Sequence, residues 1–133
     1  MLALAVSAYL LNFFWESLHA VNLYQNLDIA ASNYLPLMLY VSTVDSLLIF
    51  VMYLTVSLIW RDIFWLRKVN TKQLLTFAGT GIIIAAIIEY HALFVAHKWS
   101  YSTAMPTLFG IGLSPLLQLA VTGILALYIA RKF

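Results

Sequence analysis

Three carboxylic acids stand inside otherwise apolar stretches of this sequence: Glu16, Asp45 and Glu89. No lysine or arginine lies in the same stretches to pair with them. An ionisable side chain in such surroundings is costly to bury and usually marks a functional site. Carboxyl groups there can act as general acids and bases, hold a cation or relay protons. We therefore take the three acids as the candidate catalytic residues.

Other polar residues recur at helical spacing around these acids. Asn12, Glu16 and His19 are spaced i, i+4 and i+7, which puts them on one helix face. Ser114, Gln118 and Thr122 are spaced i, i+4 and i+8, which also puts them on one helix face. Aromatic side chains beside the acids would suit a lipophilic ligand or stabilise a cation. The candidate ligand-binding residues are Asn12, Trp15, His19, Gln118, Trp99 and Tyr101, with Trp99 and Tyr101 at the outer rim.

One local motif raises the question of a metal. Glu16 and His19 form a Glu-x-x-His pair, the spacing found in carboxylate-bridged di-metal bundles. Such sites need two of these motifs, and this chain has one. A single divalent ion held by Glu16, His19, Asp45 and Glu89 is chemically sensible, although chance spacing on one helix explains the motif equally well. The sequence assigns no other cofactor.

The composition of the chain indicates what kind of structure holds these residues. The chain has 133 residues, of which 64% are hydrophobic and 9% charged, with a mean hydropathy of +0.95. Soluble domains carry roughly 25% charged residues. This composition excludes a soluble globular domain and a disordered chain, and it predicts no nucleic-acid partner. The absence of cysteine excludes disulfides and thiolate chemistry.

Four segments are long and apolar enough to cross a bilayer as helices, since a span needs about 20 such residues. They run from about 2 to 24, 36 to 60, 74 to 95 and 106 to 130. The sequence thus predicts an all-α polytopic membrane protein, a four-transmembrane-helix bundle forming a single membrane domain over residues 1–133. Pro36 and Pro106 are expected in first helical turns, and Pro115 is expected to kink the last helix.

Basic residues predict the orientation, because they favour the cytoplasmic side. Four of the seven lie between residues 61 and 72, and Arg131 and Lys132 end the chain. Both termini should therefore be cytoplasmic in a multi-pass protein of the cell membrane. Each buried acid then lies eight or nine residues from the outer end of its span. That distance is roughly 12–14 Å, so the acids share one layer in the outer half of the bilayer.

The sequence also resembles a known group. It carries N-F-x-W-E at residues 12–16, W-x-Y-x-x-x-M-P at 99–106 and G-x-G-L-x-P-x-x-Q at 110–118. The pattern resembles a group of small four-helix bacterial integral membrane proteins. The resemblance transfers no chemistry. It implies only that the polar and aromatic residues of these motifs belong to one site together with Asp45 and Glu89.

These observations leave three functions open. A carboxylate and histidine pocket could bind or convert a small lipophilic, amphipathic or cationic molecule, with or without a metal. The acids could instead serve a proton-coupled or cation transporter, or the chain could be an accessory subunit of a larger membrane complex. Few polar residues follow Asp45 or precede Glu89, which favours a pocket open on one side. Small residues at 79, 81, 85 and 86 offer a helix-packing seam, used within the chain or in a homo-oligomer.

Overall fold

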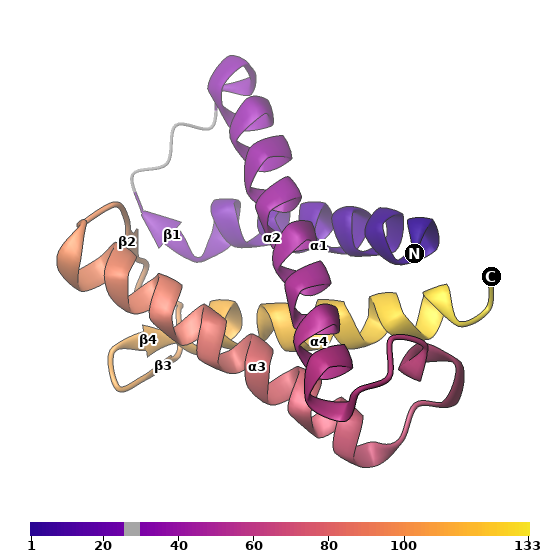
Figure 1. Cartoon of the computed structure of the whole chain (residues 1–133). Coiled ribbons are helices and arrows are strands. Elements are labelled where there is room, and N and C mark those ends of the chain that lie inside the picture. Colours follow the sequence, from indigo (N-terminus) through magenta and orange to yellow (C-terminus); the bar gives the residue numbers. More distant parts are fainter. Residues whose placement is uncertain (26–29) are drawn as a thin grey trace.

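The computed structural model describes residues 1–25 and 30–133, and within them the chain is all-helical apart from a few two-residue strands. Asp28, the one aspartate between the first two expected spans, lies outside the described residues. The long helices, coloured along the sequence in Figure 1, are α1 (Leu2–Asn22), α2 (Ala31–Trp60), α3 (Thr71–Tyr90) and α4 (Leu113–Ala130).

Short elements join these helices. They are the strands β1 (Tyr24–Gln25), β2 (Ser100–Tyr101), β3 (Thr107–Leu108) and β4 (Ile111–Gly112), the 3₁₀ turn η1 (Trp65–Lys68) and the π-helical turn η2 (His91–Val95). β1 pairs with β2 and β3 pairs with β4, both antiparallel.

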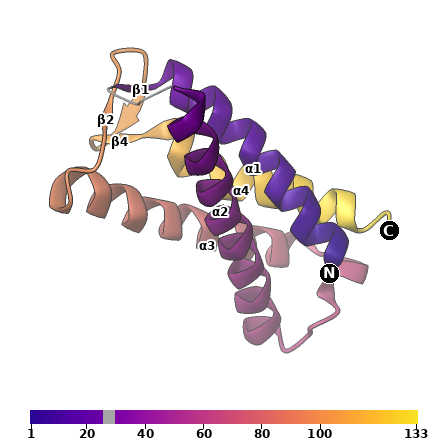
Figure 2. The same cartoon turned by 90° about the horizontal axis from the view of Figure 1, so that it is seen from above.

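The helices pack around α4. It lies antiparallel beside α1 and contacts α3 along its other side, while α2 crosses obliquely over α1 and α3 (Figures 1 and 2). The two chain termini lie near each other in both views. This arrangement brings the C-terminal ends of α1 and α3 and the N-terminal ends of α2 and α4 to the end of the molecule where the strands lie (Figure 2).

Three helices of the described part of the chain are long and apolar enough to cross a membrane: Ser32–Trp60, Thr71–Val95 and Leu113–Ala130. α1 is not among them, although it has 21 residues. Its second half carries Asn12, Glu16 and His19, which lower its mean hydropathy. The residues that make α1 less apolar are thus the candidate site residues.

Local signals explain where two helices begin. Asn70 caps α3, because its side chain accepts from the Gln73 N–H while the Gln73 side chain accepts from the Asn70 N–H. This reciprocal capping box starts α3 at Thr71, three residues before the expected span. α2 begins at Ala31, so Pro36 lies inside the helix and not in its first turn. The Ala30 carbonyl opens this helix by accepting from the N–H groups of Asn33 and Tyr34.

The expected start of the last helix is wrong. Pro106 precedes the hairpin β3–β4, and α4 begins only at Leu113. Phe109 and Gly110 both take left-handed backbone angles, with φ of 52° and 81°, and this turn closes the hairpin. Pro115 consequently lies in the first turn of α4, where a missing N–H is tolerated, and not at the expected mid-helix kink.

An apolar core fills the half of the molecule that holds the termini. It joins Leu4 of α1, Ile49 and Met52 of α2, Phe77 of α3 and Leu127 of α4. Trp65 of η1 folds back into this core and is fully buried. Within the small-residue seam, Gly81 lies against Met52 and the backbone of Ala120, whereas Gly79 has no neighbour within 4 Å of its would-be Cβ. This part of the seam serves packing within the chain.

Candidate functional site

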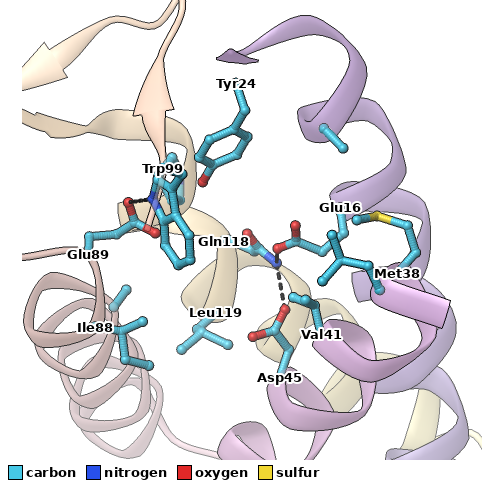
Figure 3. Close-up of a pocket in the computed structure, with 14 residues that line it drawn as sticks. Glu16, Tyr24, Met38, Val41, Asp45, Ile88, Glu89, Trp99, Gln118 and Leu119 are labelled. Atoms are coloured by element: carbon cyan, nitrogen blue, oxygen red, sulfur yellow. Dashed lines mark hydrogen bonds between the residues drawn. The ribbon is translucent and has the colours of Figure 1, made fainter. Parts of the chain in front are cut away.

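A partly open cavity of about 160 Å³ lies between the four long helices, at the end opposite the apolar core. All three acids reach it, Glu16 from α1, Asp45 from α2 and Glu89 from α3 (Figure 3). Gln118 of α4 also lines it. The rest of the wall is apolar or aromatic: Ala20, Tyr24, Leu37, Met38, Val41, Ala85, Ile88, Trp99, Pro115 and Leu119. The structure therefore brings together acids that lie far apart in the sequence.

Gln118 joins two of the acids. Its side-chain nitrogen Nε2 donates to Glu16 Oε1 at 2.7 Å and to Asp45 Oδ2 at 2.9 Å. The Glu16 and Asp45 carboxyl groups thus share one donor nitrogen. Two carboxyl groups that accept from one nitrogen lie close together, and two ionised acids at such a distance would repel each other. One amide thus fixes a carboxyl pair on one wall of the cavity.

Asn12 and Thr122 support this pair from behind. Asn12 is fully buried, and its Oδ1 accepts from Gln118 Nε2 at 3.2 Å and from the Thr122 hydroxyl at 3.1 Å. Asn12 Nδ2 donates to the Ala8 carbonyl one turn earlier. Since the Gln118 amide has two hydrogens and three acceptors within reach, it can shift between them without leaving its position.

Glu89 faces the carboxyl pair from the other side of the cavity (Figure 3). Its side-chain oxygen Oε2 accepts from the Tyr101 hydroxyl and from Trp99 Nε1, the latter at 3.4 Å. Burial and the hydrogen bond to Glu89 raise the pKa of Tyr101, so its phenol stays protonated and donates. Glu89 also interacts electrostatically with both Glu16 and Asp45.

The chain reverses direction after α3, and this reversal brings the two donors Trp99 and Tyr101 to Glu89. The π-helical turn η2 replaces the last turn of the helix, with Ala96 N–H bonded to the His91 carbonyl. His97 then takes a left-handed φ of 47°, and the strand β2 pairs with β1 in the register Tyr24 to Tyr101. Turns of this π type occur frequently at functional sites. Here the turn returns Trp99 and Tyr101 to the acid that precedes it.

Two of the predicted ligand-binding residues point elsewhere. His19 Nε2 shares a hydrogen bond with the Ser114 hydroxyl, and its ring packs edge-on against Trp15 at a centroid distance of 5.4 Å. Neither His19 nor Trp15 is among the residues that line the cavity. Their nitrogens His19 Nδ1 and Trp15 Nε1 are buried and have no hydrogen-bond partner within the described residues. Asn12 and Tyr101 do not line the cavity either, but each forms a hydrogen bond with a residue that does.

This placement bears on the metal hypothesis. Residues 1–25 and 30–133 contain no group of three or more histidine, aspartate or glutamate side chains arranged to hold a metal ion. The four predicted ligands are divided, because His19 turns to Ser114 and Glu89 is held by Tyr101 across the cavity from Glu16 and Asp45. This donor set does not fit a single metal ion.

Tyr24 is the site residue that the sequence analysis missed. Figure 3 shows its side chain at the cavity beside Trp99, and its ring lies 6.0 Å from that of Trp99 and 5.7 Å from that of Tyr101. Burial, followed by the negative charge of Glu89 and Glu16, raises its pKa. The spacing Glu16, Ala20, Tyr24 is i, i+4, i+8, so the stripe that carries Glu16 could have indicated it.

Comparison of the sequence with protein-family models and with curated proteins, and of the chain with solved structures, finds no match. The function therefore has to be inferred from the arrangement of the site. The site offers two carboxyl groups joined by Gln118 on one wall, a third acid with aromatic donors on the other, and apolar surface between them.

Proposed function

We propose that the chain is an integral membrane protein that binds a small amphipathic molecule in this cavity and exchanges a proton with it through the Glu16–Asp45 pair. The observation that carries the proposal is the position of three acids on facing walls of a cavity whose remaining lining is apolar. A fully polar metabolite does not match the apolar part of this lining. A lipophilic molecule with one polar group matches both the apolar wall and the acids.

The proposal includes four membrane crossings with both termini in the cytoplasm. α1 has 21 residues, a length of about 30 Å as a helix, which spans the hydrocarbon of a bilayer. Basic residues gather at the α2–α3 connection and at the end of α4, on the side that the positive-inside rule assigns to the cytoplasm. The cavity would then open in the outer half of the membrane.

The core favours binding over transport. A transporter for protons or cations needs a polar path to the second side of the membrane. Toward the termini, the described helices are joined by the apolar cluster around Ile49, Met52 and Phe77. The three acids also argue against an accessory subunit. Acids directed into a cavity would serve no structural purpose in such a subunit.

A lipid-soluble carbodiimide tests the proposal. Dicyclohexylcarbodiimide reacts with a protonated carboxyl group in apolar surroundings and adds its own mass to that residue. We expect membranes to show the adduct on Glu16 or Asp45 by peptide mass spectrometry. Asp62, exposed in the α2–α3 connection, is the internal control and should stay unmodified.

Two tryptophan variants link the reaction to the cavity. Val41→Trp fills it, whereas Leu39→Trp, on the same helix but exposed and outside the lining, does not. Labelling of Glu16 or Asp45 should fall in Val41→Trp and remain in Leu39→Trp. Native mass spectrometry of gently extracted protein should likewise show a retained small molecule in the wild type that Val41→Trp loses. Equal labelling of both variants, or preferential labelling of Asp62, would contradict the proposal.

A further inference from the structure

A second and larger recess lies at the opposite end of the molecule from the acids. It has a volume of about 560 Å³ and is formed by the last turns of α2, the connection around η1 and the end of α4. Its floor and sides are mainly apolar, with Phe50, Leu54, Ile63 and Phe64 all partly or fully exposed. Exposed apolar surface is usual on a membrane-spanning chain, but its combination with cationic groups in one hollow indicates a binding site.

Two guanidinium groups border this recess, Arg67 from η1 and Arg131 from the end of α4. No aspartate or glutamate side chain is among the described residues that line it. The nearby Asp62 is engaged locally, because its Oδ1 accepts from the Phe64 N–H at 2.8 Å. Arg67 rests on the ring of Phe64 at 4.7 Å, which holds its guanidinium over the apolar surface.

We propose that this recess binds an anionic phospholipid of the inner leaflet. The headgroup phosphate is held by Arg67 and Arg131, since guanidinium groups match phosphate oxygens in bidentate geometry. An acyl chain lies along Phe50, Leu54 and Ile63. The two positive charges favour a headgroup whose phosphate is not balanced by a cationic group in the same headgroup. The apolar residues beside them favour a lipid over free phosphate.

The inference depends on the membrane placement proposed above but not on the chemistry of the acid-lined cavity. A bound lipid here would tie α2 to α4 at the end where the chain termini meet. The two sites are separated by the apolar core, so each can fail without the other.

The test uses the full chain in nanodiscs that contain phosphatidylglycerol and phosphatidylcholine in equal amounts, analysed by native mass spectrometry after release. The wild type should retain phosphatidylglycerol in preference to phosphatidylcholine. Equal retention of the two lipids would overturn the proposal without any variant. Excess inorganic phosphate should leave the bound phosphatidylglycerol in place, whereas its displacement would reassign the site to free phosphate.

A matched pair of double variants separates a specific site from diffuse surface attraction. Arg67→Gln with Arg131→Gln removes two charges inside the recess. Lys68→Gln with Lys132→Gln removes two charges from adjacent positions that do not line it. Hydrogen bonds to a charged group predict a loss of roughly tenfold or more in affinity for each arginine removed. Affinity should fall at least about tenfold further in the arginine pair than in the lysine pair, and equal losses would overturn the specific site.

Discussion

The amide of Gln118 is the point at which α1, α2 and α4 meet, and its removal gives the sharpest test of the site. Its Nε2 lies 2.7 Å from Glu16 Oε1, 2.9 Å from Asp45 Oδ2 and 3.2 Å from Asn12 Oδ1. Gln118→Leu keeps a side chain of similar size and takes away both N–H donors. The three acceptor oxygens then lose their common partner.

The expected loss follows from the two hydrogens that the amide can donate at once. Hydrogen bonds between membrane helices average about 0.6 kcal/mol and reach about 1.7 kcal/mol. Two such bonds to carboxyl groups give a loss of roughly 1–3 kcal/mol in the free energy of unfolding. Because the cavity is partly open, water can reach the oxygens that lose their donor. The loss in the free energy of unfolding therefore stays within this range and below the loss expected in a sealed core. Denaturation by sodium dodecyl sulfate in mixed micelles, followed by tryptophan fluorescence, measures it.

Gln118→Glu serves as the isosteric control. It preserves shape and replaces the donating nitrogen with an oxygen, so that three carboxyl groups meet at neutral pH. We expect a loss larger than that of Gln118→Leu, with recovery on mild acidification, because the protonated form donates one hydrogen bond again. Our reasoning is refuted if Gln118→Leu unfolds with the free energy of the wild type, or if Gln118→Glu is fully stable at neutral pH.

Two further predictions concern the surroundings of the site. Gly79→Ala should raise the free energy of unfolding by up to about 1 kcal/mol through helix propensity, since its new Cβ meets open space. Gly81→Ala should lower that free energy, because its Cβ would lie 3.2 Å from the backbone nitrogen of Ala120; a shift of equal sign in the same unfolding titration would contradict the packing of α3 on α4. Tyr101→Phe should destabilise the chain by about 1 kcal/mol, since Glu89 then keeps only the longer bond from Trp99, and an unchanged unfolding midpoint would show that the Tyr101 hydroxyl is dispensable.

Some of the site could be predicted because helical geometry is local. The spacing Asn12–Glu16 and the spacing Gln118–Thr122 each put two polar groups on one helix face, and Asn12, Glu16, Gln118 and Thr122 are all joined in the structure. The depth argument also matched Glu16 with Asp45, which meet through Gln118. It did so although one reference point was wrong, since α2 begins at Ala31 and not near Pro36.

The failures have a common physical cause, which is contact between distant segments. His19 was grouped with Glu16 on one face, yet Ser114 offers it a hydrogen-bonding hydroxyl and draws its ring away from the acids. The hairpin β3–β4 depends on left-handed backbone angles at Phe109 and Gly110, and the sequence alone suggested an apolar helix there. Neither outcome is encoded in the periodicity of a single segment.

By itself the sequence determined that this chain is helical, strongly apolar and supplied with three acids that have no basic partner nearby. These properties follow from the composition and from the 3.6-residue period of the helix, and both can be read from each segment of the sequence by itself. Only the tertiary structure decided that Glu16 and Asp45 share a wall while Glu89 faces them, because that depends on how α2 crosses its neighbours and how η2 reverses the chain. The rotation and crossing of packed helices are set by side chains on several elements at once, and no one stretch of sequence contains them.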